Sequence, residues 1–398
     1  MTRILPPRTP TQASAGSVTV RDIDAATEQH VSRRYWDWLR LYERDGDAAV
    51  LRHPERLVNL AAAARAECRR NSALLTCGDD GGPAALAVLV PKDIPARRVG
   101  GWGLPWTFRG DWLAGNELFG RPDEPARSEL LHAVAGQLTA RRSDFLLVED
   151  LDEHSPLRHE LAAMRQAGFR IFEPYGLQAR HRLQLPDDAA EYWSRFSGRR
   201  RNLFRRRLRQ IGAVECECVQ SPDQVADFLE QAHRISQKTW QSRRLGLRIR
   251  NDETELAQLT FLAMHGALRS YLLRQGDRPL AFLIGHQSGG TFHYEEVGFD
   301  GDEAKSSPGL VLLLKVLDDL FARDRPAWFD FGAGDAEYKQ LFASHSSRSG
   351  DVWLVPPGVR RRAAFASLNL CRAARRRGQA CCECFNAWPA VRQWLRRR

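Results

Sequence analysis

The feature that most constrains the fold is an internal repeat of short apolar runs. "PAALAVLVP" (83–91) and "RPLAFLIGH" (278–286) each follow a turn that contains glycine. Apolar runs of this length between turn residues are typical of buried strands. A stretch rich in glycine and aromatic residues follows each run, "VGGWGLPWTF" (99–108) in the first half and "GGTFHYEEVGF" (289–299) in the second. We therefore expect two copies of one mixed α/β unit.

The two copies continue in the same order. In each copy the pattern predicts a long helix, then a strand, then a second helix after the apolar run. Two further helices are predicted before each apolar run. The predicted helices and strand after the apolar runs are 126–142, 144–150 and 154–167 in the first copy, and 308–324, 327–333 and 335–343 in the second. The preceding helices are predicted at 27–42 and 55–69, and at 188–211 and 223–240.

The chain of 398 residues is too long for one ordinary hydrophobic core, so two domains are expected. We predict a disordered leader over 1–18, an N-terminal domain over 19–185, a C-terminal catalytic domain over 186–356 and a basic Arg-rich tail over 357–398. No uncharged apolar run approaches the roughly 18 residues of a membrane span. The N-terminus has no hydrophobic segment typical of a secretion signal, so we expect a cytoplasmic protein.

The net charge of +10 is confined to the tail. Residues 359–398 hold eleven Arg and one Glu, which leaves 48 basic and 48 acidic residues before them. The tail is therefore expected to contact an anionic membrane surface on the inner face of the membrane, a nucleic acid or a protein partner.

Three of the eight cysteines, Cys381, Cys382 and Cys384, lie close together in the tail. The tail has no histidine, so a complete zinc site would need a fourth ligand from elsewhere. Free thiols are the favoured interpretation, and we predict no metal.

A second basic segment, "YWSRFSGRRRNLFRRRLRQIG" (192–212), contains eight Arg and no acid. Its apolar residues recur at helical spacing, and Gly212 ends the pattern as a helix C-cap would. One interpretation is a solvated amphipathic helix whose arginines pair with acids elsewhere. The other is a surface for a phosphate-rich ligand or a polyanion, on which Arg200 is our candidate contact.

The segment "RPAWFDFGAGDAEYKQLF" (325–342) places charged and polar residues around one glycine turn. Asp330 lies among aromatic residues at the end of the predicted strand. Asp335 stands where a helix N-cap would, and Tyr338 and Lys339 follow in the first turn. Either these residues are an ordinary cap with a surface charge, or the turn belongs to an active site.

The order of these elements resembles the GNAT acyltransferases, in the duplicated form of the CelD/BcsL-type acetyltransferases associated with cellulose and exopolysaccharide biosynthesis, and the resemblance is stronger in the second half than in the first. More distantly it is similar to the FemAB-like peptidyltransferases. The resemblance covers about residues 20–355 and lies in "SGRRRNLFRRRLRQI", "RPLAFLIGHQSGGTFHYEEVGFD", "SSPGLVLLLKVLDDL" and "FDFGAGDAEYKQLF". It implies two tandem GNAT-like α/β domains, each a largely antiparallel sheet flanked by helices, with acyl-CoA, most simply acetyl-CoA, as co-substrate.

A GNAT-type site holds a pyrophosphate, and a helix N-terminus is a suitable anion site. The resemblance points to Ser306, Ser307, Gly309 and Leu310 at the start of the helix 308–324. Ser306 or Ser307 can cap this helix, and Gly309 lets a phosphate approach. The common Arg/Gln-x-x-Gly-x-Gly/Ala pattern keeps only its first glycine here. A capped helix without a ligand is the alternative.

Acyl transfer needs a base for the proton of the nucleophile. Glu295 and His293 are candidates, as base or as substrate contacts, because strand alternation puts them on one face and Glu296 on the other. By resemblance, Tyr338 protonates the leaving thiolate and Lys339 contacts a phosphate or carbonyl. Asp335 completes the candidate catalytic set.

Candidate acceptor contacts are Trp102, Trp106, Asp330 and Arg200, since aromatic faces suit sugars and acyl chains; core packing is the alternative for the tryptophans. The expected activity moves an acyl group to an amine or hydroxyl of a sugar, a polysaccharide precursor or a related metabolite. Two alternatives stay open. One is a FemAB-like transferase that uses aminoacyl-tRNA, and the other is a non-catalytic scaffold at an anionic membrane surface.

Overall fold

The computed structural model describes residues 18–23, 53–79, 82–101, 104–120, 124–239 and 249–384. The predicted helix at 27–42, Trp102 and all of the predicted leader except Val18 lie outside these residues.

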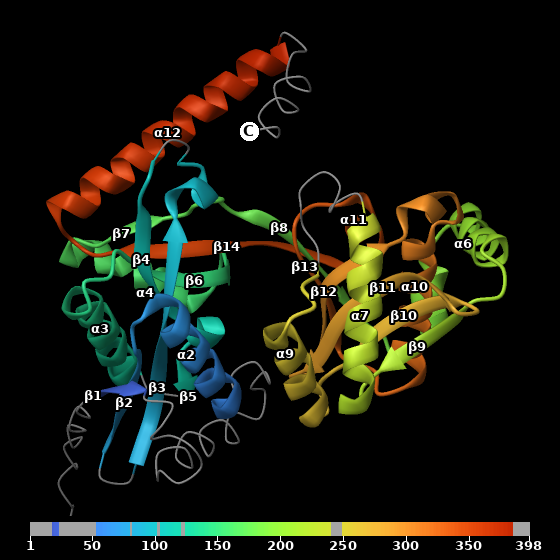
Figure 1. The fold of residues 1–398 in the computed structure, drawn as a ribbon, viewed down its shortest axis with the longest axis horizontal. Helices are drawn as coiled ribbons and strands as arrows, with labels where there is room; N and C mark the ends of the chain where they lie inside the picture. Colours follow the sequence, from blue (N-terminus) through green and yellow to red (C-terminus); the bar gives the residue numbers. More distant parts are fainter. Residues whose placement is uncertain are drawn as a thin grey trace, which may run out of the picture.

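A single sheet of 14 strands runs through both halves of the chain, in the order β1-β2-β3-β4-β6-β14-β8-β13-β12-β11-β10-β9 (Figure 1). β5 pairs with β3 and β7 pairs with β14 beside this path. The strands are β1 Val18–Ile23, β2 Ser72–Asp79, β3 Gly82–Pro95, β4 Thr107–Leu113, β5 Phe119–Gly120, β6 Phe145–Asp152, β7 Arg170–Phe172, β8 Gln178–Gln184, β9 Glu215–Val219, β10 Ser270–Gln275, β11 Arg278–Ser288, β12 Thr291–Phe299, β13 Trp328–Ala333 and β14 His345–Val355.

The predicted repeat is present as two units with the same strand order. In the first, β2, β3 and β4 form an antiparallel meander, and β4 then pairs in parallel with β6. In the second, β10, β11 and β12 form the meander, and β12 pairs in parallel with β13. Each parallel pair is only three residues long, so both units contain the same short parallel contact within a largely antiparallel sheet.

The two units exchange strands with each other. β8 precedes the second unit in sequence, yet it lies between β13 and the N-terminal part of β14. The C-terminal part of β14 returns to the first unit and pairs with β6 and β7. Strand pairing therefore crosses the domain boundary that we predicted after residue 185, and that boundary stays a prediction.

Helices cover both faces of each unit. In the second unit α7 and α9 bury one face and α10 buries the other, which gives two separate apolar cores. In the first unit α3 and α4 lie over one face and α2 over the other. The helices are α2 Pro54–Cys68, α3 Glu124–Ala140, α4 Pro156–Ala163, α5 Ala189–Ser194, α6 Gly198–Gln210, α7 Pro222–Lys238, α9 Glu253–Met264, α10 Pro308–Ala322, α11 Glu337–Phe342 and α12 Val359–Cys384.

The helix that we predicted over 188–211 is divided into α5 and α6. Ser197 lies between them in an extended conformation, and its hydroxyl accepts the backbone N–H of Arg200 at 3.3 Å. A serine cap of this kind starts a new helix, so the chain can turn between the two apolar segments.

The first part of the predicted tail forms the long helix α12, which packs across the first unit (Figure 1). Phe365 and Leu368 are buried in a cluster with Phe108, Phe172 and Trp353. Among the described helices, none carries a stretch apolar enough to cross a membrane.

Candidate active site

The central feature of the second unit is the place where β12 and β13 separate. They pair in parallel only at Thr291–Trp328, Phe292–Phe329 and His293–Asp330. Beyond these pairs the strands diverge and border a cavity of about 460 Å³, a size typical of small-molecule sites. The cavity is lined by Ser236, Thr239, Phe282, Tyr294, Glu295, Glu296, Val297, Phe331, Gly332, Ala333, Tyr338 and Lys339.

A β-bulge at Glu295 determines which side chains of β12 reach the cavity. Ile284 of β11 pairs with Glu296 and Gly285 pairs with Tyr294, so Glu295 has no partner in the register. The extra residue breaks the regular alternation of the strand. Glu295 and Glu296 consequently both line the cavity, and our expectation that they lie on opposite faces, with at most one toward the cleft, is wrong.

Glu295 is in contact with a buried pair of histidines. Its carboxylate lies 3.1 Å from Nδ1 of the fully buried His286, whose ring stacks on that of His293 at 4.5 Å between centroids. Burial alone would raise the pKa of Glu295, but His286, His293 and Arg56 hold it below its usual value. Burial and His286 lower the pKa of His293 to about 4, so this ring is neutral near pH 7.

The pKa of the neighbouring Glu296 is shifted in the opposite direction. Burial raises its pKa, and the charges of Glu255 and Glu295 add to this effect. Two adjacent carboxyl groups whose pKa values are shifted apart can take different roles in one reaction, the ionised one as a base. Glu295 is therefore the more firmly ionised of the two carboxyl groups. His293 is not among the residues that line the cavity.

The glycine turn after β13 brings Tyr338 and Lys339 to the cavity. Gly332 and Gly334 have φ of +70° and +97°, which only glycine adopts readily. The Tyr338 hydroxyl donates to the Tyr294 hydroxyl at 3.4 Å, and burial raises the pKa of Tyr338. Lys339 donates through Nζ to the Ala333 carbonyl at 2.9 Å, and burial lowers its pKa.

Asp330 lies beneath this turn in a buried ion-pair network. Arg180 Nε donates to its carboxylate at 2.9 Å, Arg182 Nε at 3.0 Å and the Gly332 backbone N–H at 2.9 Å. Both arginines come from β8, the strand exchanged from the first half. Asp330 is 1% exposed, so its carboxylate holds the turn and the exchanged strand together. Its predicted contact with the acceptor stays a prediction.

Asp335 does not cap the helix that follows. The N-cap of α11 is Ala336, and Asp335 instead accepts from His181 Nε2 at 3.0 Å and from Gln340 Nε2 at 2.6 Å. The predicted N-cap at Asp335 is therefore wrong, although the residue remains beside the turn that carries Tyr338.

The predicted pyrophosphate site lies at the start of α10. Ser307 is the N-cap residue, with φ of +57° and no side-chain capping bond, and the Ser306 hydroxyl donates to the Glu303 carbonyl. Ser307 therefore stands at the predicted N-cap position, but neither serine caps α10 through a side-chain hydrogen bond. A Cβ at Gly309 would come within 3.1 Å of Phe299, so this glycine also serves packing. Leu310 follows in the first turn, and none of the four residues lines the cavity at Glu295.

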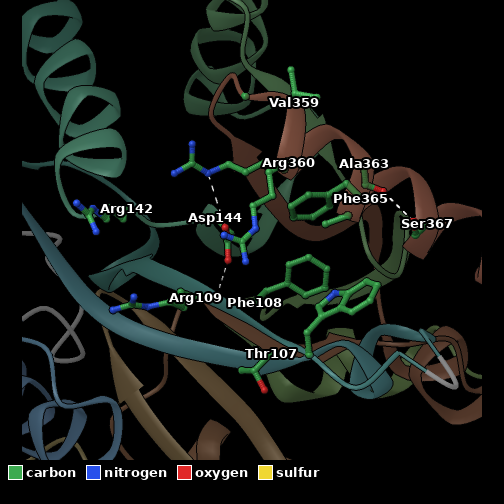
Figure 2. Close-up of a pocket in the computed structure, with 14 residues that line it drawn as sticks. Thr107, Phe108, Arg109, Arg142, Asp144, Val359, Arg360, Ala363, Phe365 and Ser367 are labelled. Carbon is green, nitrogen blue, oxygen red and sulfur yellow. Dashed lines mark hydrogen bonds and ion pairs between the residues drawn. The ribbon is translucent and has the colours of Figure 1, made fainter.

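The remaining candidates lie elsewhere. Trp106 lines a different cavity of about 820 Å³ in the first unit, between β4 and α12, together with Arg109, Asp144 and Arg361 (Figure 2). Trp102 lies outside the described residues. Arg200 lines a third cavity, of about 1180 Å³, formed by one face of α6. Its lining residues are Ser197, Arg199, Arg200, Asn202, Leu203, Arg206 and Arg209.

His286 is not among the candidate residues predicted from the sequence, although the turn that follows it indicates its position. Gly289 and Gly290 both have positive φ, which is typical of a two-residue hairpin turn. Such a turn fixes the register of its strands and sets His286 opposite His293. Two histidines facing each other beside a glutamate would have drawn attention to this position.

The chain was compared with known proteins. Residues 197–340 match the family described as "Acetyltransferase (GNAT) domain". No curated protein sequence matches the chain significantly. Among solved structures, FemX is 13% identical with a TM-score of 0.52, covering 73% of this chain and 90% of that one.

Two further structures are similar at lower scores. A tandem GNAT protein from the clavulanic acid biosynthesis pathway is 10% identical with a TM-score of 0.45, over 86% of this chain and 100% of that one. L-PGS from Bacillus licheniformis is 11% identical with a TM-score of 0.44, over 72% of this chain and 86% of that one. The fold class that we predicted, two tandem GNAT-like α/β domains, is confirmed, and the second of them contains the acetyltransferase (GNAT) match.

Proposed function

We propose that the chain is an acyltransferase of the CelD/BcsL type that moves an acyl group, in the simplest case acetyl, from acyl-CoA to an acceptor. The acceptor is an amine or a hydroxyl on a sugar, a polysaccharide precursor or a related metabolite. The observation that carries this proposal is the cavity between β12 and β13, where an ionised glutamate and a protonated tyrosine line one space within the GNAT domain.

In this proposal Glu295 is the general base. Its carboxylate is kept ionised by His286 and is 47% exposed on the cavity side, so it can accept a proton from the acceptor. Loss of this proton lets the acceptor nitrogen or oxygen form its bond to the acyl carbon, while the bond from that carbon to sulfur breaks. General bases of this kind contribute roughly 10²–10⁴-fold to the rate.

Tyr338 is the proposed proton donor to the leaving sulfur. Burial raises the pKa of its hydroxyl, which therefore keeps its proton at neutral pH. One proton thus passes from the acceptor to Glu295 and another from Tyr338 to the thiolate, so the reaction balances. Lys339 keeps the glycine turn closed through Ala333, and this bond positions the tyrosine.

The start of α10 is the proposed site for the pyrophosphate of the acyl donor. No side chain caps this 15-residue helix, and the positive end of its dipole suits an anion. Pro308 has no N–H, and the N–H groups of Leu310 and Val311 donate to the Ser307 carbonyl, so the anion would be held by the dipole and the N–H of Gly309. The packing of Phe299 against Gly309 means that a larger residue there would also disturb the protein itself. A change at Gly309 is therefore a poor test, and changes in the cavity are better ones.

The decisive experiment measures acetyl transfer to a panel of amino sugars and sugar alcohols, with thiol release as the readout. We expect Glu295→Gln to lower kcat/KM by about 10²–10³-fold and to leave acyl-CoA binding within threefold, since the residue acts on the acceptor. Glu296→Gln, which changes the adjacent carboxylate of the same cavity, is the matched control. If Glu295→Gln keeps full activity, or loses no more activity than Glu296→Gln, the proposed base is wrong.

A second candidate function is favoured by α6. Four arginines line the cavity on this helix, and no acidic residue is among its lining residues. Such a surface suits a polyanion, so the acyl donor can instead be an aminoacyl ester of an RNA. Binding of tRNA that weakens steeply with salt and is lost in Arg200→Ala and Arg206→Ala, with no binding of acyl-CoA, would favour this candidate over the first.

A further inference from the structure

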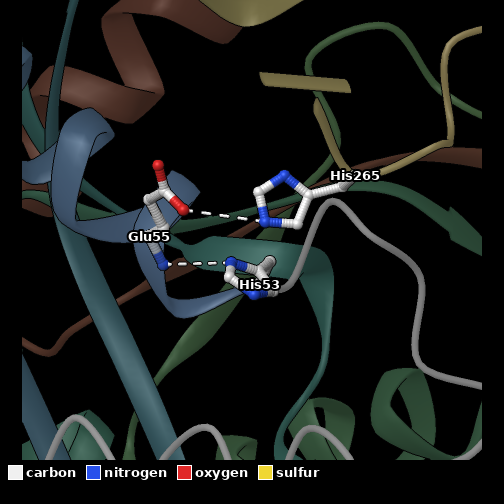
Figure 3. Close-up of side chains that lie close together, drawn as sticks. All are labelled: His53, Glu55 and His265. Atoms are coloured by element: carbon white, nitrogen blue, oxygen red, sulfur yellow. Dashed lines mark hydrogen bonds and ion pairs between the residues drawn. The ribbon is translucent and has the colours of Figure 1, made fainter. Parts of the chain in front are cut away.

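Three side chains of the kinds that bind metal ions lie close together where the two units face each other. His53 and Glu55 lie at the start of α2 in the first unit, and His265 directly follows α9 in the second (Figure 3). The rings of His53 and His265 are 4.4 Å apart between centroids, and both contact Phe261. Each of the three residues offers one nitrogen or oxygen atom, and these atoms all lie within 4.8 Å of one another.

The spacing of these atoms suits a shared ion better than a hydrogen bond. Glu55 Oε2 lies 3.6 Å from His265 Nε2, which is longer than an ordinary hydrogen bond. Zinc binds nitrogen and carboxylate oxygen at about 2.0–2.2 Å in a tetrahedral arrangement, so two of its ligand atoms are about 3.3–3.5 Å apart. The pair is therefore within a few tenths of an ångström of a ligand-to-ligand distance.

The surrounding hydrogen bonds affect the two histidine rings differently. His265 Nδ1 lies 3.0 Å from the Phe261 carbonyl and donates to it, which directs the lone pair of Nε2 toward Glu55. A histidine that binds a metal usually donates its other ring N–H to such a partner. Nδ1 of His53 accepts the Glu55 backbone N–H at 3.3 Å, a long bond that an ion can replace.

His53 is largely shielded from solvent. It is 8% exposed, and its ring packs against those of Phe261 and His265. A ligand group held among other side chains in this way is already ordered before an ion binds.

We propose that His53, Glu55 and His265 bind a divalent transition-metal ion of the zinc type, which joins the two units. Three protein ligands leave a fourth position for water. The proposal stands on this cluster alone, independently of the acyl-transfer proposal, and departs from our sequence-based expectation of no metal.

The test uses the full-length chain after removal of metals by a chelator. Titration with Zn²⁺ in a calorimeter is expected to give one saturable equivalent with Kd in the micromolar range or below. Co²⁺ in place of zinc is expected to give the visible absorption of a four-coordinate ion. Neither readout depends on enzymatic activity.

Two variants locate the site. His265→Ala removes one ligand, and His53→Asn removes another while keeping a side-chain oxygen that can cap the Glu55 N–H. Each is expected to weaken zinc binding by at least about 100-fold and to abolish the cobalt spectrum. A circular dichroism melt of each metal-free variant, matched to metal-free wild type, confirms that the fold is intact.

The cysteines of the C-terminal segment are the necessary control, because thiolates also bind zinc. A variant with Cys381, Cys382 and Cys384 changed to Ser is expected to keep the one equivalent of bound Zn²⁺ that His265→Ala loses. Zinc binding that survives both histidine changes, or that disappears only with the cysteines, would overturn the proposal. So would the absence of any binding to the wild-type chain.

Discussion

His286 Nδ1 lies 3.1 Å from the carboxylate of Glu295, and the two residues differ sharply in burial: the His286 side chain is fully buried, whereas that of Glu295 is 47% exposed and lines the cavity. The buried imidazole ring of His286 thus contacts the accessible carboxylate of Glu295 from the interior of the protein. In the proposed mechanism His286 positions Glu295 and favours its ionised form, without touching the substrate itself.

His286→Leu tests this role through the pH profile. The contact with His286 keeps the pKa of Glu295 low, so its removal is expected to raise that pKa. The acidic limb of the kcat/KM profile, which reports the base in the free enzyme, should then move to higher pH. His345→Leu, a change at an exposed histidine, is the control. An unchanged acidic limb together with a lower plateau would mean that His286 serves only packing.

Tyr338→Phe removes the proposed proton donor and leaves the ring in place. We expect kcat to fall by about 10²-fold with little change in KM, because the hydroxyl acts in the transition state. Steady-state kinetics with acetyl-CoA measures both constants. Tyr294→Phe removes the hydroxyl that Tyr338 contacts at 3.4 Å, and it should cost less than tenfold. Equal losses in the two variants would contradict the role of Tyr338.

Asp330→Asn is expected to destabilise the protein by about 3 kcal/mol, because Arg180 and Arg182 lose a buried counter-charge. Urea unfolding measures this change in the free energy of unfolding. Asp187→Asn is the matched control, since Asp187 pairs with Arg325 at the surface and is 94% exposed. Surface pairs are worth roughly 0–1 kcal/mol. If both changes cost the same, Asp330 does not hold the turn.

Stability is expected to fall as the pH is lowered from 7 to 5. The pKa of His293 is about 4 in the folded chain, so the unfolded chain binds more protons below its ordinary value of 6.5. The stability that this ring contributes is present above pH 6.5 and is lost as the pH falls toward 4, by about 1–2 kcal/mol at pH 5. Urea midpoints at both pH values should show a smaller loss in His293→Phe than in wild type. An identical loss would assign the effect to other groups.

The features of the fold that depend on local sequence patterns could be predicted from the sequence. The order of strands and helices followed from apolar runs and turns, and the cavity includes Glu295, Tyr338 and Lys339 from the predicted set. The bulge at Glu295 could not be predicted, because it depends on pairing with Ile284 and Gly285 of the adjacent strand.

The partners of Asp330 and Asp335 were also beyond prediction. Arg180 and His181 lie about 150 residues away in sequence and reach these acids only because β8 enters the second unit. The absence of a side-chain cap at Ser307 and at Asp335 has a similar cause. Both residues have the right type for a cap, but Ser307 is an N-cap with a left-handed backbone and Asp335 is held by His181 and Gln340.

The exchanged strands have a consequence for how the chain is made. β14 is the last of the described strands in the chain, and it lies between β6 of the first unit and β8, which belongs to the sheet of the second. Neither unit can close its sheet until residue 355 has left the ribosome, so the first unit must wait with an open strand edge. One strand, β14, thus completes the sheets of both units in a single step.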